Sequence, residues 1–515
     1  MKTMLILLLS LLSFFPDFDA AVLQITGAGS VEELDETTLE RFRTLSLHPV
    51  ELNSAGRSRL RSCGLFSDFQ VASLLDYRSR TGDILSFVEL SLVDGFPPGF
   101  VEALKHFVRL ESSGPPGRRH DRRLHADLML RGAMRASDDT VHAEGGKLKL
   151  ALGEVAELNW STRTTYSDGV LRPGTISAAV YGHKYLGKIV MGHFNARFGQ
   201  GLAQWSGFSL QPYGSVSSLR RSGTGFSATG SFSPELCGIA ADWDLGRWNV
   251  GAAYSFVGKL PVANISYVGQ RFTAGATATS RAVSIDWRVG IPDASIYGEV
   301  AWNGALQAVA GVMWVPSYGN KIAALGRYVE GVPELIAGAG TRSLDAVAAI
   351  SSRQFRSMAR WSPALSLGPL AFTPSLRLAA RCSESWRLEG RGELGLTWNG
   401  WLLHSRLDIV HSNGTSWLIN AEAGRTEGKL KAYFRWTLFR VEDWANRIYV
   451  YERDAPGSFN VPAYYGKGWS LSLAGSWRPS RRHAFYFRAS YIAYPWMDAP
   501  KPSRTEVKLQ YQLCL

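Results

Sequence analysis

From about Leu124 to the C-terminus, apolar and polar residues alternate with a period of two, which is the period of a β-strand. The clearest examples are Leu388–Trp398, Leu430–Leu438, Trp469–Trp477 and Val507–Leu515, each with one apolar face and one polar or charged face. Many of these segments run for about 9 to 12 residues, whereas an average strand has five or six. This length predicts tilted strands that cross a bilayer.

The alternation continues to the end of the chain without a helical interruption. A closed ring of strands satisfies every backbone hydrogen bond in lipid, which an open sheet cannot do. We therefore predict a mainly β fold, a large antiparallel transmembrane β-barrel of about 18 strands (range 14–22), after a small all-α region. An even strand number places both barrel ends on the periplasmic side. The alternative is a large soluble solenoid, propeller or sandwich array, but no fixed repeat period supports a propeller.

Composition fits this prediction without requiring it. Hydrophobic residues make up 45% of the chain and the mean hydropathy is −0.07, values that are ordinary for a soluble protein. Barrel strands also average to near neutral, because their two faces differ. Aromatic residues are 12%, with 17 Trp and 19 Tyr. Trp and Tyr concentrate at membrane–water interfaces, so this enrichment favours a membrane protein.

The N-terminus has the pattern of a secretory signal peptide. Lys2 gives a basic start, Met4–Phe15 is an apolar run, and Asp19-Ala20-Ala21 offers small residues for cleavage. The run is too short to span a bilayer as a helix. The alternative is a buried helix of a cytosolic domain.

Net charge and a run of turn-forming residues divide the rest of the chain into regions. Residues 31–110 have helical spacing, and the run 112–117 (SSGPPG) with the basic cluster 118–123 follows them. We divide the chain into a signal peptide (1–20), a periplasmic helix-hairpin-helix-like domain (21–111), a linker (112–123) and an outer-membrane barrel (124–515). Residues 21–113 hold 9 Lys/Arg and 13 Asp/Glu, while residues 114–515 carry a net charge of +17 within the chain's +12. Basic character therefore belongs to the barrel.

Two segments of the helical region share a pattern in which a short helix leads to the next helix through a tight Gly turn. They are Leu60–Asp68 and Leu92–Pro98. Together with Val50–Ala55 and Leu75–Gly82, they resemble the tandem helix-hairpin-helix domain of competence-type DNA receptors. The resemblance implies hairpin turns that contact DNA or a protein partner, at Gly64, Leu65 and Phe66 and at Gly95, Phe96 and Pro97.

DNA-binding hairpins of this family carry a second Gly, which lets backbone N–H groups approach a phosphate. Phe66 and Pro97 stand at that second position here, and proline has no N–H to donate. The region is also net negative, whereas non-specific DNA affinity comes chiefly from cationic side chains. Nucleic acid is therefore disfavoured as a partner. We prefer a periplasmic module that packs on a protein partner or on the barrel mouth.

The barrel region carries a second resemblance. Gly192–Leu202 is similar to a segment of an uncharacterised family of Bacteroidota outer-membrane proteins that combine a helix-hairpin-helix region with a barrel. Arg447–Glu452 and Val461–Trp469 match another such segment. The resemblance implies location and architecture but no established substrate. Its most characteristic residues are Arg197, Phe198, Gly199, Gln200 and Gly201.

The sequence lacks HExxH, GxSxG, a P-loop and a GxGxxG after a strand. We therefore expect no enzyme, no catalytic residue and no cofactor. His120, His125 and His142 gather near Asp121, where a solvated basic linker is favoured over a metal site. The four cysteines form no CxxC pair, so they support no metal cluster and define no disulfide. They are Cys63, Cys237, Cys382 and Cys514.

Cations that alternate with apolar residues are candidates for the barrel lumen. They are Arg377, Arg387, Arg391, Arg406, Lys431, Arg435, Arg478 and Arg488. Two interpretations stay open. The charges either line a plugged, salt-bridged interior or bind lipopolysaccharide phosphates at the rim, or they line a pore for anionic solutes, including nucleic acid. The Gly/Ala-rich stretch Gly331–Arg342 is interpreted as an external loop.

The sequence thus favours a non-enzymatic outer-membrane channel, transport or export component with a periplasmic interaction domain. One alternative is a membrane-anchored scaffold that recruits a periplasmic protein. The other is DNA binding and uptake through the helix-hairpin-helix region.

Overall fold

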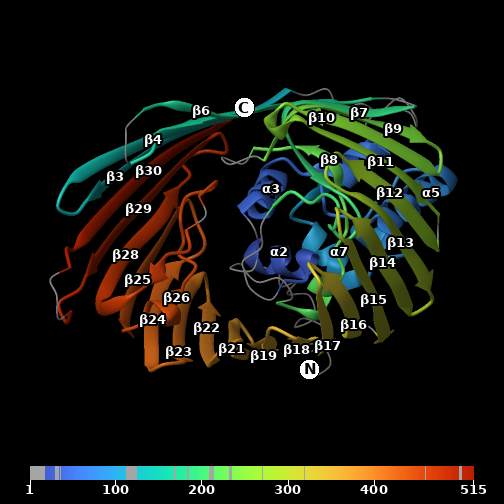
Figure 1. Ribbon diagram of the computed structural model, residues 1–515. Helices are drawn as coiled ribbons and strands as arrows, with labels where there is room; N and C mark the ends of the chain where they lie inside the picture. The colour runs from blue at the N-terminus through green and yellow to red at the C-terminus, as the bar shows by residue number, and fades with distance from the viewer. Residues whose placement is uncertain are drawn as a thin grey trace, which may run out of the picture.

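The computed structural model describes residues 18–28, 34, 36–111, 124–166, 170–182, 185–207, 214–230, 235–269, 271–317, 319–458, 460–497 and 501–515. Twenty-four antiparallel strands close into one ring (Figure 1). The ring closes where the last strand, β30 (Arg504–Cys514), pairs with the first, β3 (Leu124–Ala136). The predicted mainly β, closed antiparallel barrel is therefore confirmed.

The ring strands follow one another in chain order, with each strand paired to the next. Between β3 and β30 they are β4 (Thr140–Leu152), β5 (Ala156–Arg163), β6 (Arg172–Tyr181), β7 (Leu186–Arg197), β9 (Leu236–Leu245), β10 (Trp248–Ser255), β11 (Leu260–Val268), β12 (Phe272–Thr279), β13 (Val283–Ile291), β14 (Ala294–Trp302), β15 (Leu306–Ser317), β16 (Asn320–Val329), β17 (Val332–Gly340), β18 (Leu344–Ser351), β19 (Phe355–Trp361), β21 (Leu370–Cys382), β22 (Trp386–Trp398), β23 (Trp401–His411), β24 (Thr415–Arg425), β25 (Leu430–Val441), β28 (Gly466–Trp477) and β29 (His483–Ala493).

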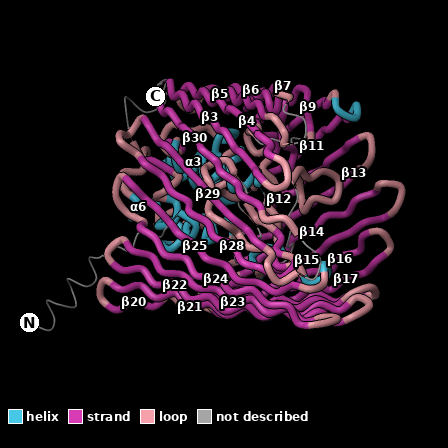
Figure 2. The backbone as a smooth tube through the Cα atoms, turned by 90° about the vertical axis from the view of Figure 1, so that its left-hand side faces the viewer, coloured by secondary structure: helices cyan, strands magenta, loops and turns pink. Residues whose placement is uncertain are grey.

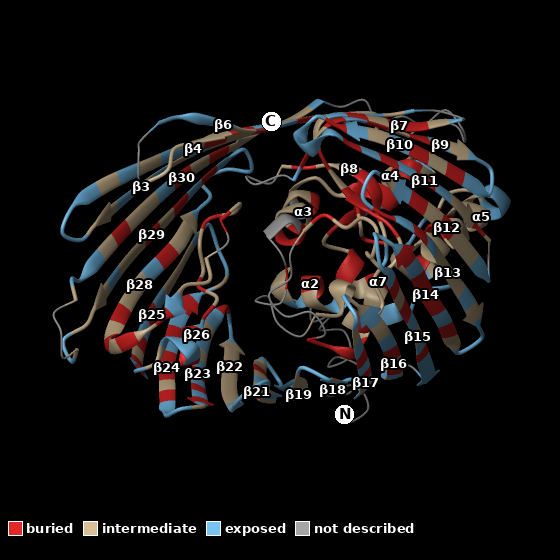
Figure 3. Cartoon of the chain, in the orientation of Figure 1, coloured by how far each residue is buried: buried red, intermediate tan, exposed pale blue. Residues whose placement is uncertain are grey.

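The outward face of the strands is apolar and exposed, and the buried inward face carries polar and charged side chains together with some apolar ones. On β23, Arg406 and Asp408 are 5% exposed, whereas Leu403, Leu407 and Ile409 are 43 to 50% exposed. The same alternation appears as bands of colour along the ring strands (Figure 3). A soluble sandwich has the opposite polarity, because its inner faces form the hydrophobic core.

The predicted strand number of about 18 is wrong, and the upper limit of 22 is also too low. Short strands joined by tight turns account for the difference. The stretch Gly331–Arg342 contains strand β17, which pairs with both β16 and β18. Its glycines and alanines are poor strand formers and resemble a loop in sequence. The hydrogen bonds of two neighbouring strands hold it extended.

The two ends of the barrel differ in their connections. The end that holds the barrel termini has short turns such as β9–β10 and β13–β14. The opposite end carries the long connections, which are 198–235 between β7 and β9 and 442–465 between β25 and β28. Outer-membrane barrels show this asymmetry, with short periplasmic turns and long extracellular loops.

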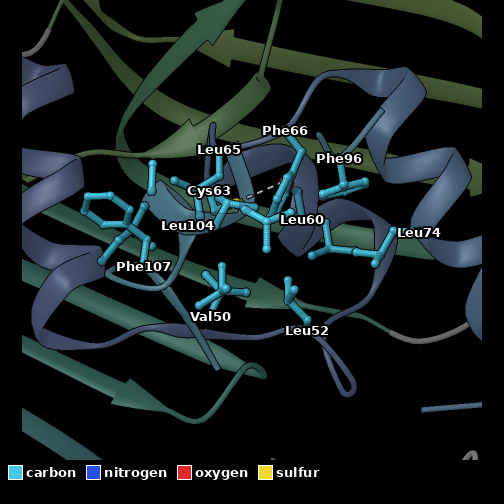
Figure 4. Close-up of a cluster of buried hydrophobic side chains, with 14 of the residues drawn as sticks. Val50, Leu52, Leu60, Cys63, Leu65, Phe66, Leu74, Phe96, Leu104 and Phe107 are labelled. Carbon is cyan, nitrogen blue, oxygen red and sulfur yellow. Dashed lines mark hydrogen bonds between the residues drawn. The ribbon is translucent and has the colours of Figure 1, made fainter. Parts of the chain in front are cut away.

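Residues 18–111, here called the helical segment, form their own hydrophobic core (Figure 4). Its helices are α2 (Phe18–Thr26), α3 (Glu36–Leu47), α4 (Arg57–Ser62), α5 (Asp68–Thr81), α6 (Phe87–Leu90) and α7 (Pro98–Leu104). Two short parallel strands, β1 (Val50–Glu51) and β2 (Val108–Arg109), join its beginning to its end. No described helix has the length and apolar character needed to cross a membrane.

The two predicted Gly turns are present. Gly64 links α4 to α5 with φ +68°, and Gly95 precedes α7 with φ +88°. Ser67 caps α5, and its capping box with Gln70 satisfies the first free backbone N–H groups. The assignment of this segment to the helix-hairpin-helix family stays a prediction.

The helical segment lies inside the ring of strands. Figure 1 shows α2, α3 and α7 enclosed by the barrel wall, and Figure 2 shows α3 and α6 through it in one half of the barrel. Its wall contacts include the β4–β5 and β9–β10 turns, through Glu154 and Gly246. Both turns belong to the end that carries the barrel termini. Its predicted location in the periplasm stays a prediction.

The helical core should have a stability of its own. Leu74 on α5 is fully buried in it. We expect Leu74→Ala to destabilise the helical segment by about 2–5 kcal/mol, because a buried Leu leaves a cavity. Proteolysis of the segment in detergent-solubilised protein measures this. Leu85→Ala is the control, since Leu85 is 76% exposed. Equal sensitivity of the two variants would contradict a packed core.

Candidate functional site

The lumen is the candidate site, and three segments of the chain occupy it. They are the described parts of the helical segment, of the β7–β9 loop (198–207 and 214–230) and of the β25–β28 loop (442–458 and 460–465). The β7–β9 loop includes the short 3₁₀ helix η2 (Val216–Leu219) and strand β8 (Gly225–Ala228). The β25–β28 loop includes η4 (Trp444–Asn446), β26 (Ile448–Tyr449) and β27 (Ala463–Tyr464).

An arginine on α4 links the helical segment to the wall through an ion pair and a ring contact. Arg59 Nε donates to Glu154 at 2.5 Å, and its Nη1 lies 3.6 Å from Glu157 on β5. Its guanidinium also lies over the ring of Tyr181 on β6, 5.2 Å from the centroid. The Arg59 side chain is only 13% exposed, so this ion pair is desolvated. Removing one partner would leave a buried charge, which costs several kcal/mol.

Further polar contacts spread the attachment over the wall. Ser58 Oγ donates to Asp244 at 2.8 Å. Lys147 on β4 pairs with Glu40 on α3, and His48 pairs with Asp127 on β3. These partners come from β3, β4 and β9, so the segment is held by several strands at once.

Glu51 carries a buried carboxyl at this interface. Its backbone N–H donates to Glu154 at 3.1 Å, and its side chain is buried. Burial is the main cause that raises the pKa of Glu51 to about 7, with the nearby charges of Glu111 and Glu154 adding to it. Backbone N–H groups of Asn53 and Glu111 act in the opposite direction.

The raised pKa of Glu51 predicts that the stability of the helical segment depends on pH. A carboxyl whose folded pKa lies above its unfolded value near 4.5 contributes stability at low pH and loses it as pH rises through about 7. We expect the thermal stability of the helical segment to fall between about pH 5 and pH 8. This range begins just above the unfolded pKa of Glu51 and contains its folded pKa. Glu51→Gln should flatten that dependence. An unchanged pH profile in Glu51→Gln would refute the role of Glu51.

The family-like residues Arg197 to Gly201 begin the β7–β9 loop, which binds a buried carboxylate on β14. Glu299 is 1% exposed. Its Oε2 accepts the backbone N–H groups of Gln200 at 2.7 Å and Leu202 at 3.1 Å, and its Oε1 accepts that of Ala203 at 3.4 Å. Three aligned N–H groups compensate a buried negative charge. The loop is thereby fixed to the inner wall.

Glycine is required at two positions of this turn. Gly199 has φ +54°, and a Cβ there would lie 2.8 Å from Glu299 Oε2. Gly201 has φ +90°, and a Cβ there would lie 2.8 Å from Arg221 Nη1. Trp205 packs under the guanidinium of Arg221, 5.0 Å from its ring centroid. Glycine often marks a close approach of the backbone to a neighbouring group, and both positions show one here.

Two glycine substitutions distinguish the cost of backbone strain from the loss of the contact between the loop and Glu299. Gly199→Ala and Gly246→Ala both place Ala at positive φ, which costs about 1–2 kcal/mol. Only Gly199→Ala also displaces Glu299, because nothing lies within 4 Å of a Cβ at Gly246. We expect a larger fall in thermal stability and faster cleavage of the β7–β9 loop for Gly199→Ala. Equal effects would show that the Glu299 contact is unimportant.

Four of the predicted lumen cations hold the β25–β28 loop. Arg406 and Arg435 donate to the backbone carbonyls of Tyr449 and Tyr451, at 2.9 and 2.8 Å. Arg387 donates to the carbonyl of Ala445. Arg488 pairs with Glu452 of the loop and with Glu506 of β30, the latter at 2.8 Å.

The other four predicted positions differ in their surroundings. Arg391 pairs with Asp408 at 2.8 Å, and Arg377 is buried on β21. Lys431 is half-buried on the same face of β25 as Arg435. Arg478 lies exposed in the turn after β28, where it donates to Tyr486 Oη at 2.9 Å. On this side of the lumen most predicted cations are therefore already engaged by the protein.

The predicted hairpin residues face the inside of the barrel. Leu65, Phe66 and Phe96 are buried in the helical core, with Phe66 and Phe96 rings 5.8 Å apart. Phe66 therefore packs the turn at Gly64 against the turn at Gly95. Gly64, Leu65, Phe66, Gly95 and Pro97 also line a cavity between the helical segment and the wall.

That cavity has a volume of about 1740 Å³. Wall strands β12–β18 and their turns at the termini end form its outer side. Cations dominate its charged lining, with Arg41, Arg80, Arg197, Arg220, Arg221, Arg271, Arg288, Lys321 and Arg342 against Asp76, Asp94, Asp293 and Asp345. The cavity is therefore electropositive.

Sequence reasoning missed the cavity cations Arg220, Arg288 and Lys321. Arg288 on β13 and Lys321 on β16 alternate with outward Val289 and Ile322, so the period of two could have found them. Arg220 lies in the β7–β9 loop, for which alternation gives no signal. Only the insertion of that loop into the lumen brings it to the wall.

The described part of the chain contains neither a group of side chains arranged to bind a metal ion nor a disulfide. No group of three His, Cys, Asp or Glu side chains there is arranged to hold a metal ion. His120 and Asp121 of the suggested cluster lie outside the described residues, as do residues 1–17 of the predicted signal peptide and the linker 112–123. All four cysteines are free thiols in the structure.

No family model matches the chain, and no curated protein matches it. Solved structures of Pseudomonas aeruginosa proteins overlap with it at low identity. OccK11 (OpdR) is 9% identical over 76% of this chain and 96% of that chain, with a TM-score of 0.33. The outer membrane protein opdK is 10% identical over 76% and 99%, with a TM-score of 0.31. OccK2 (OpdF) in complex with glucuronate is 7% identical over 76% and 98%, with a TM-score of 0.33. Such TM-scores carry no argument about this chain.

Proposed function

We propose that this protein is an outer-membrane β-barrel that acts as a gated channel, transport or export component. The inverted polarity of the ring is the support for a membrane location. Outward side chains such as Trp401, Leu403 and Ile409 are 44 to 54% exposed, and inward ones such as Asn420 and Glu422 are buried. An apolar outer surface of this extent has lipid as its natural solvent, and ring closure leaves no unpaired strand edge.

The orientation follows from the two barrel ends. Outer-membrane barrels place short turns in the periplasm and long loops outside the cell. By this rule the barrel termini and the wall turns that hold the helical segment face the periplasm. The β7–β9 and β25–β28 loops enter the lumen from the outer side.

One observation carries the transport proposal. The lumen of a wide ring is filled by segments that are separate from the ring strands. Barrels of 16–18 strands already leave an aqueous channel, and this ring has 24. The helical segment folds around its own core and meets the wall through polar pairs such as Arg59–Glu154. Such an interface can open without exposing a hydrophobic core to water. Opening would create a solute path along the wall.

A second candidate is a membrane-anchored scaffold that recruits a periplasmic protein. One observation favours it. Leu85, Val88 and Leu92 of the helical segment, around α6, are 75 to 76% exposed. Three large apolar side chains held so far into solvent are typical of a contact surface for a protein partner.

A reversible crosslink tests whether the helical segment must move. Ser58 and Asp244 face each other across the interface, so a Ser58→Cys/Asp244→Cys double variant can link α4 to β9. We expect planar bilayers to show little conductance for the oxidised variant and larger, intermittent openings after reduction. Deletion of residues 21–113 should raise conductance most.

Single-cysteine variants at these two positions are the matched controls, because they cannot form the crosslink. Absence of conductance with or without residues 21–113 would refute the channel proposal and favour the scaffold. Equal conductance of the oxidised and reduced double variant would exclude movement of α4 as the gate.

A further inference from the structure

We propose that the cavity between the helical segment and strands β12–β18 is a binding site for a small multivalent oxyanion, held by Arg220, Arg288 and Lys321. This deepens the proposed transport function by naming a solute class and a binding place. The site depends only on lumen geometry, so it can be tested without an open pore.

The three cations converge from three different elements. Arg220 follows η2 in the β7–β9 loop, Arg288 lies on β13 and Lys321 on β16, and all three line the cavity. Arg220 is close enough to interact electrostatically with both Arg288 and Lys321. Like charges this close repel one another, and the repulsion is strong in a partly desolvated lumen. The fold holds them together at a cost that an anion would remove.

The protein supplies hydroxyl groups, rather than carboxylates, to two of these cations. Arg220 Nη1 donates to Ser295 Oγ at 3.1 Å, and Lys321 Nζ donates to Ser217 Oγ at 2.7 Å. Asp345 and Asp68 attract Lys321 and Arg288 from a distance. None of the described carboxylates, Asp345 and Asp68 included, has an oxygen within 4.0 Å of a charged nitrogen of these three cations.

The contrast with the opposite wall supports a ligand here. On strands β22–β25, Arg391, Arg406 and Arg435 each have a carboxylate partner within 3.0 Å. Burial together with the charge of Arg288 lowers the pKa of Arg220 to about 10, which marks a cation without its counter-ion. Guanidinium groups bind carboxylates and phosphates in forked geometry, and an ammonium adds a point charge. A multivalent oxyanion matches all three groups.

Isothermal titration of the full chain in detergent micelles tests the site, with inorganic pyrophosphate and citrate as probes and acetate as the monovalent control. Ionic strength is held constant with sodium chloride, because salt screens exposed charges. We expect one pyrophosphate or citrate to bind per chain, and acetate to bind much more weakly. Arg220→Gln and Arg288→Gln should each weaken binding about tenfold or more, the value of one charged hydrogen bond.

Arg353→Gln is the matched control, because Arg353 is exposed in the β18–β19 turn outside the cavity. It should bind as the unmodified protein does. A second readout guards against misfolding. The ligand-free Arg220→Gln protein should unfold at the same or a higher temperature, because repulsion is relieved, and should lose the upward shift that pyrophosphate or citrate gives.

Failure of both probes to bind would overturn the proposal. So would unchanged binding in Arg220→Gln and Arg288→Gln, or acetate binding as tightly as citrate. A ligand-free melting temperature lowered by Arg220→Gln would show that Arg220 stabilises the loop instead. Because titration needs no bilayer, loss of binding and loss of conductance are distinguishable failures.

Discussion

A ring of 24 strands encloses a lumen that inward side chains from the wall cannot fill, because barrel diameter grows with strand number. The chain fills part of this space with three segments of its own, and they meet an inner wall that alternation makes polar. Many attachments are therefore ionic or hydrogen-bonded, as in Glu299 with the β7–β9 loop and Arg435 with the β25–β28 loop, and small hydrophobic clusters support both loops. The same period of two that exposes apolar side chains outside thus determines how the inside is closed.

One kind of interaction stabilises the helical segment, and another kind holds it in position. Its stability comes from a core in which Leu60, Leu74 and Phe107 are fully buried, and within that core cluster only Tyr451 comes from outside the segment. Its position comes from pairs such as Arg59–Glu154, whose charges are desolvated on both sides. Breaking several such pairs together, with water entering, costs less than removing one partner and leaving the other buried. A segment built in this way can move as a body.

Local pattern predicted the wall of the barrel well, and it predicted the contents of the lumen poorly. Alternation identified Leu388–Trp398 and Trp469–Trp477 as strands and assigned their faces correctly. It undercounted strands where Gly and Ala replace β-branched residues, as in β17. An inward Arg406 looks the same in sequence whether it meets water or the carbonyl of Tyr449, so the docking of loops and helices had no local signal. The departure of Phe66 from the pattern of a DNA-binding hairpin is visible in the sequence, but its packing against Phe96 depends on the fold.

The positive charge of the barrel is distributed unequally once the lumen is filled. On β22–β25 and β28–β30, carboxylates and the β25–β28 loop engage the cations, as with Arg488 between Glu452 and Glu506. On β13–β16 the inserted β7–β9 loop does the reverse, because it adds Arg220 to a wall that already presents Arg288 and Lys321. The same loop already packs the apolar Val216 and Leu219 against this wall, so filling space does not require Arg220, and an unpaired buried cation is costly. The fold therefore keeps one side of the lumen satisfied by its own residues and leaves the other side in need of an anion.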